Sequence, residues 1–115
     1  MALKFTSILS ILIICCQFNR KIKLDESPEK TKEILLSHIP VGSDEMFAKK
    51  TMEENNFKCK HTNKGEFLDI NNIDFIYCDR EDWKGILVFR RWQIAIILKK
   101  NRVENIQVST GLLGP

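Results

Sequence analysis

The chain has 115 residues, a length that fits one domain, and its formal net charge is +3. Hydrophobic residues make up 43% of the chain and charged residues 29%, as in an ordinary globular protein. The net charge is too small to indicate a nucleic-acid partner, because such proteins carry a larger and clustered basic excess.

The first sixteen residues have the proportions of a secretory signal peptide. A short positive start precedes a run from Phe5 to Cys16 that is apolar apart from three hydroxyl side chains. A membrane-spanning helix needs about 20 apolar residues, so this run is too short to be one. We therefore predict that residues 1–16 direct export of the chain. The alternative is a helix buried in the core.

Two cysteines end the apolar run. The segment from Leu12 to Cys16 resembles the lipobox of bacterial lipoproteins, in which a small residue precedes the lipidated cysteine. Ile14 is too large for that position whereas Cys15 is small, so we predict lipidation at Cys16. Acyl chains would then hold the protein on the bacterial envelope, facing the periplasm. The alternatives are an uncleaved anchor and a soluble secreted protein.

A polar stretch, residues 17–26, follows and is typical of a tether, and we expect a single domain over residues 27–115. Ser27 and Pro28 are a strong helix start, and Pro40 ends that helix. A second helix is predicted from Ser43, as its N-cap, to about Asn55.

Alternating apolar residues then predict three or four strands joined by short turns. The predicted strands are Phe57–Thr62, Ile73–Cys78, Ile86–Leu98 and Val103–Ser109, the third being either one central strand or two strands broken near Arg90. The predicted turns are 63–65, 79–82 and 99–102, and residues 66–72 are either loop or strand. Short connections favour antiparallel pairing, so we predict an α+β fold with both helices on one face of an antiparallel meander.

This order of elements resembles the SmpA/OmlA (BamE-like) family of small outer-membrane lipoproteins, whose fold is shared with β-lactamase inhibitor proteins. The likeness covers residues 39–109 and is carried by the segments Val41–Ser43, Asp74–Tyr77, Trp92–Leu98 and Asn101–Ile106. The family helix usually ends in a Leu-Gly-x-Pro turn, where this chain has Asn55-Asn56-Phe57. The resemblance therefore also fits an uncharacterised exported protein of the same fold, and it implies the fold more directly than the assembly role.

Cys59 and Cys78 are the candidate disulfide. An exported chain meets an oxidising compartment, and the two cysteines lie on successive predicted strands. The alternative is a pair of buried thiols. Adding His38 and His61 gives no recognised zinc spacing, so we predict no metal site.

No nucleophile elbow, zinc-protease motif or phosphate-binding glycine loop is present, so we predict a non-enzymatic protein without a cofactor or a small-molecule substrate. Arg90, Arg91 and Trp92 are the candidate interaction surface. The two arginines, with Lys49, Lys50, Lys58 and Lys60, are a candidate basic face toward anionic lipid or an acidic partner. The alternative is that these charged residues are ordinary solvated surface. The expected function is a scaffold or interaction lipoprotein that binds another envelope protein. The alternative is a secreted, inhibitor-like binding protein.

Overall fold

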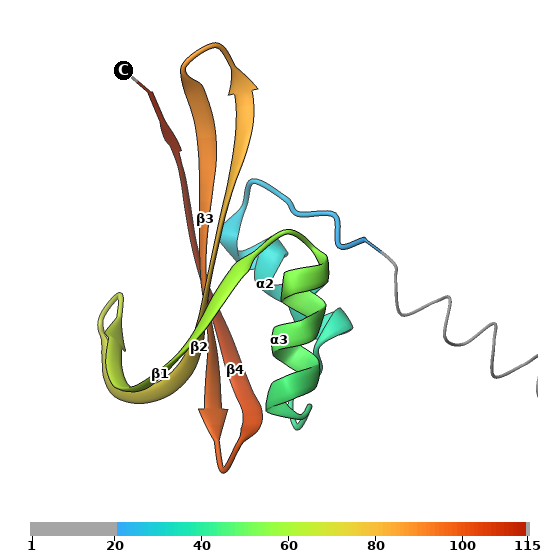
Figure 1. Ribbon diagram of the computed structural model, residues 1–115, viewed down its shortest axis with the longest axis vertical. Coiled ribbons are helices and arrows are strands. Elements are labelled where there is room, and N and C mark those ends of the chain that lie inside the picture. The colour runs from blue at the N-terminus through green and yellow to red at the C-terminus, as the bar shows by residue number, and fades with distance from the viewer. Residues whose placement is uncertain (1–20, 115) are drawn as a thin grey trace, which may run out of the picture.

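A computed structural model describes residues 21–114 of the chain. Within that range two helices precede four strands: α2 (Pro28–His38), α3 (Glu45–Glu54), β1 (Lys58–Phe67), β2 (Ile70–Gly85), β3 (Val88–Lys99) and β4 (Arg102–Leu113). The strands pair antiparallel in the order β1-β2-β3-β4 (Figure 1). The predicted α+β class, with helices followed by an antiparallel meander, is confirmed.

The helix starts follow from their capping residues. The hydroxyl of Ser27 accepts a hydrogen bond from the backbone N–H of Lys30, and Pro28 occupies the first turn of α2, as predicted. The predicted N-cap of α3 was wrong. Asp44 caps this helix by accepting from the N–H of Met46 at 3.0 Å, because the Ser43 hydroxyl donates instead to the Pro40 carbonyl.

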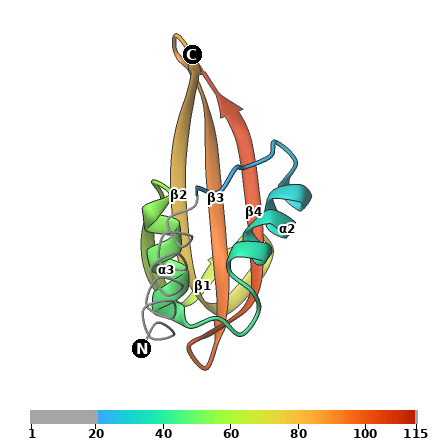
Figure 2. The ribbon, with the colours of Figure 1, turned by 90° about the vertical axis from the view of Figure 1, so that its right-hand side faces the viewer.

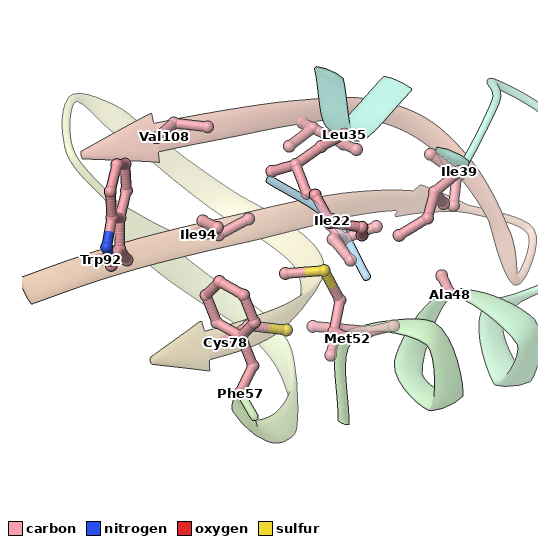
Figure 3. Close-up of a cluster of buried hydrophobic side chains, with 14 of the residues drawn as sticks. Ile22, Leu35, Ile39, Ala48, Met52, Phe57, Cys78, Trp92, Ile94 and Val108 are labelled. Carbon is pink, nitrogen blue, oxygen red and sulfur yellow. The ribbon is translucent and has the colours of Figure 1, made fainter. Parts of the chain in front are cut away.

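Both helices cover the same face of the sheet and form the main core with it (Figures 1 and 2). Each helix buries one side, because its buried residues are four positions apart: Ala48 and Met52 in α3, and Leu35 in α2 followed by Ile39 just after its end. Figure 3 shows these side chains against the sheet. The fully buried members are Leu35, Ile39, Ala48 and Met52 from the helical part and Ile76, Cys78, Ile94, Ile96 and Ile106 from the strands.

The described part of the predicted tether, residues 21–26, packs on the domain. Ile22 is 5% exposed and joins the main core, and Leu24 packs against it. The intervening Lys23 is exposed, as expected when side chains alternate along an extended segment. The packed chain therefore includes Ile22, which precedes the predicted domain start at residue 27. Residues 17–20 lie outside the described range.

Two predicted turns were wrong, because each lies inside a longer strand. Residues 63–65 form an irregularity within β1, where the pairing with β2 shifts and Lys64 has a φ of +49°. Residues 79–82 continue β2, where their charges find partners across or along the sheet. The observed hairpin turns are 68–69, 86–87 and 100–101. The last falls inside the predicted turn at 99–102, and β3 runs unbroken through Arg90.

The two ends of the sheet differ. At one end, the β1–β2 hairpin curls over the face opposite the helices (Figure 1), where a second apolar cluster forms from Phe67, Phe75, Ala95 and Ile97. At the other end, β2, β3 and the end of β4 extend beyond both helices (Figures 1 and 2). We call this extension, residues 80–90 and 110–114, the arm.

Candidate functional site

On the β2 side of the arm, a strand edge has no strand partner in the described chain. β1 begins at Lys58, which pairs with Asp79, and the chain before Lys58 turns away toward α3. β2 continues to Gly85 with β3 on its inner side. Within residues 21–114, the outer edge of β2 beyond Asp79 therefore has no strand partner. Such an edge presents backbone N–H and C=O groups that pair readily with another extended segment.

A shallow hollow of about 460 Å³ lies along this free edge. Its lining comes from the start of β1 and from the β2 side of the arm. The lining residues are Asn56, Lys58, Asp79, Arg80, Glu81, Asp82 and Trp83. Cations, carboxylates and one indole ring thus border a strand edge, a composition suited to a peptide rather than to an apolar small molecule.

The lining of the hollow includes the ion pair between Arg80 and Asp82. Arg80 donates to both carboxylate oxygens of Asp82 at 2.8 Å and to the Asn55 carbonyl at 3.0 Å. The Trp92 indole N–H also donates to Asp82, at 3.2 Å. The hydrogen bond from Arg80 is the main cause that lowers the pKa of Asp82, so this carboxylate is ionised at neutral pH. The guanidinium also lies over the Phe57 ring, with 5.3 Å to its centroid.

The three residues predicted as an interaction surface do not lie on one surface. Trp92 is 3% exposed and belongs to the main core, and the Arg90 guanidinium lies over its ring at 5.8 Å from the centroid. Arg91 faces the opposite side of the sheet, where it pairs with Asp79 at 3.1 Å. Successive strand residues point to opposite faces, so three consecutive residues of β3 cannot share one.

The free end of the arm is an exposed apolar surface that was not predicted from the sequence. Ile86 is 91% exposed, Trp83 66% and Leu87 61%, and Leu112 and Leu113 are exposed beside them. The register places Trp83 beside Phe89 and Phe89 beside Leu113, in one row across three strands. The run of four apolar residues from Ile86 to Phe89 carried the signal. The predicted strand Ile86–Leu98 begins with this run, whereas Ile86 and Leu87 form a hairpin turn in the structure.

Cys59 and Cys78 are direct partners across β1 and β2, and their sulfur atoms lie 2.8 Å apart. Both are thiols in this structure, and Cys78 is fully buried whereas Cys59 is half-buried. The hydrogen bond with Cys59, followed by burial, raises the pKa of the Cys78 thiol. The structure therefore brings the two predicted cysteines together, and their oxidation to a disulfide stays a prediction.

Neither histidine forms a hydrogen bond or an ion pair with Cys59 or Cys78 in the described chain. His38 is the last residue of α2. His61 contacts the Glu45 carboxylate at 2.5 Å through Nδ1 and Asn63 through Nε2, and so joins β1 to the start of α3. Across residues 21–114, no three histidine, cysteine or carboxylate side chains gather as a metal site would require. No helix in that same range is long and apolar enough to cross a membrane.

The predicted lipidation residue, Cys16, lies outside the described range, as does Cys15. Comparison with protein families, with curated proteins and with solved structures finds no match for this chain. The likeness to the SmpA/OmlA family therefore stays a resemblance of short segments.

Proposed function

We propose that the protein is an exported, non-enzymatic interaction module that binds an extended segment of another envelope protein. The observation that carries this proposal is the free outer edge of β2 in the arm, beside a hollow of about 460 Å³. A partner strand added there gains backbone hydrogen bonds, and the neighbouring side chains select its sequence.

The side chains along the edge define the complementary partner. Glu81 is exposed on one face of the arm beside Arg91 of β3, and Trp83 follows on the same face. A basic residue beside Glu81 and an apolar residue beside Trp83 fit this order of groups. On the other face, Arg80 and Asp82 already satisfy each other and favour a neutral polar residue.

Site-specific photocrosslinking tests the proposal. The full chain is expressed in its native cells with a photoreactive amino acid in place of Glu81. This group should give a crosslink to one defined protein. The same group at Glu66, exposed near the far end of β1, is the matched control and should give none. Equal labelling from both positions, or none from position 81, would rule out the edge as the contact.

We further propose that Cys16 carries a lipid anchor that keeps this module at the bacterial envelope. The support is the apolar run that ends in Cys15 and Cys16. Intact-mass measurement of the native protein should find a mature chain that begins at Cys16 and carries acyl groups. A longer or unacylated chain would reject the anchor, and a shorter, freely secreted one would favour the inhibitor-like alternative.

A further inference from the structure

The end of the arm carries apolar side chains on both faces of the sheet and at its turn. We call this end, residues 83–89 and 111–114, the tip. Trp83, Phe89 and Leu113 lie in a row on one face of the sheet, and Leu112, which pairs beside Arg90, belongs to the other. Ile86 and Leu87 form the turn itself and are both exposed. A flat protein partner covers one face of such a tip and leaves the other in water.

Charge is excluded from the tip except at its base. Neither Gly85–Phe89 nor Gly111–Gly114 contains an ionisable side chain. Lys84 is the exposed charge within the tip, and it stands next to Trp83. An indole ring and a long ammonium side chain are the groups that favour the boundary between water and lipid, because each has an apolar body and a polar end.

The backbone of the turn supports an apolar role for its side chains. Leu87 has a φ of +67°, a left-handed conformation in which glycine or asparagine costs less than leucine. Its side chain makes up none of this cost by burial, since it is 61% exposed. Leu68, in the turn at the other end of the sheet, has the same combination, so the turn backbone supports the inference only together with the apolar residues gathered at the tip.

We infer that the tip inserts into the interfacial layer of a phospholipid bilayer. A fluid apolar phase surrounds a protrusion on all sides, which matches the distribution of its side chains. Insertion is shallow, because the outer edges of β2 and β4 carry backbone groups that hydrocarbon cannot satisfy. This contact does not involve the proposed anchor at Cys16. It shares Trp83 with the hollow beside the β2 edge, whereas the strand partner is tested at Glu81, so the two proposals can fail separately.

Fluorescence of Trp83 tests the insertion directly. The full chain is reconstituted with vesicles of phosphatidylcholine whose acyl chains carry bromine. The vesicles are prepared with and without phosphatidylglycerol. Trp83 should shift to shorter wavelength, be quenched by bromine and be shielded from aqueous iodide. The Trp83→Phe variant, which retains the buried Trp92, identifies the emission that belongs to Trp83.

The matched variants separate the tip from the rest of the surface. Ile86→Ser with Leu87→Asn should leave Trp83 open to iodide while the fold is kept, because asparagine tolerates positive φ. Leu68→Asn makes the same change at the other end of the sheet, where Leu68 is 54% exposed with a φ of +54°, and should behave as the parent chain.

Three outcomes would overturn the inference. The first is a vesicle-bound parent chain whose Trp83 stays open to iodide and unquenched by bromine. The second is shielding of Trp83 without vesicles, which assigns the tip to a second copy of the chain. The third is shielding that appears only with an added envelope protein, which assigns it to a protein pocket. An unchanged unfolding transition in the double variant excludes misfolding as the cause of lost shielding.

Discussion

Asn55 accepts a hydrogen bond from the backbone N–H of Ile22 at 2.7 Å, across a sequence separation of 33 residues. Asn55 is 6% exposed, and its amide nitrogen donates to the Thr51 carbonyl at 2.8 Å. One buried side chain therefore ends α3 and fastens the segment that precedes α2. The attachment of residues 21–26 to the domain depends on this amide as well as on burial of Ile22.

Replacing Asn55 by alanine should lower the free energy of unfolding by about 1–3 kcal/mol, because the Ile22 N–H stays buried without a partner. Urea unfolding followed by circular dichroism measures the change. Asn71→Ala, at an exposed position, is the control and should change stability by less than about 0.5 kcal/mol. An equal, small effect in both variants would contradict the role assigned to Asn55.

We propose that the protein is exported, so the Cys59–Cys78 pair should be oxidised in the protein isolated from its native source. Unfolding in the presence of an alkylating agent, followed by non-reducing proteolysis and mass spectrometry, should recover the two cysteines in linked peptides. The disulfide should stabilise the domain by roughly 3 kcal/mol, mainly by restricting the unfolded chain. Reduction should accordingly lower the melting temperature by several degrees.

The variant Cys59→Ala with Cys78→Ala is the control for this measurement, since reductant should leave its melting temperature unchanged. Recovery of both cysteines in alkylated form from the native protein would instead identify two thiols. That result would agree with the alternative stated from the sequence.

Stability should fall in acid partly through Asp82. The pKa of Asp82 in the folded protein is lowered from its ordinary value of 3.8, chiefly by the hydrogen bond from Arg80. A lowered carboxylate pKa contributes stability above the ordinary value and loses it as the pH falls through the folded value. Because the side chain is partly exposed, we expect a contribution of about 1 kcal/mol.

Unfolding at about pH 6 and about pH 2 measures this contribution in the parent chain and in Asp82→Asn. The parent chain should lose more stability than the variant over this interval. A double-mutant cycle with Arg80→Gln should show that the two side chains act together. Identical acid sensitivity in the parent and Asp82→Asn would remove Asp82 from the account.

Gly65 marks a close approach inside β1. A Cβ atom there would meet the Thr62 methyl at 2.5 Å and the Phe75 ring at 3.1 Å. Gly65→Ala should therefore destabilise the fold by about 1–3 kcal/mol through overpacking. Adding Thr62→Ser removes the methyl group and should recover part of the loss, as thermal unfolding can measure. A loss unaffected by Thr62→Ser would place the cause elsewhere.

The fold class was predictable because its signals are local. Ser27 and Pro28 specify a helix start. Asn101 specifies a hairpin turn, in which it adopts a φ of +64°. The turns at 63–65 and 79–82 failed for a different reason. Glycine and charge clusters are turn signals only when no partner strand satisfies them, and here β2 and β3 supply partners to both stretches.

The candidate site was less predictable than the fold. Cys59 and Cys78 were found because each lies in a recognisable strand, so their neighbouring positions followed from the meander. The arm was missed because a turn with Leu87 at positive φ breaks the usual preference for glycine or asparagine. The free edge of β2 depends on how far β2 outlasts β1, and strand length is a tertiary outcome that periodicity does not define.

The position of β4 has a consequence for the order in which the protein can fold. Val103, Ile106 and Val108 complete the core beneath the helices, and α2 packs against this last strand. During synthesis α2 and α3 emerge long before that surface exists, and short helices are marginal without packing. The chain therefore remains open until residues 103–108 are available. A chain that stays unfolded until its last strand is made is compatible with the export that we propose, since it can cross a membrane before folding.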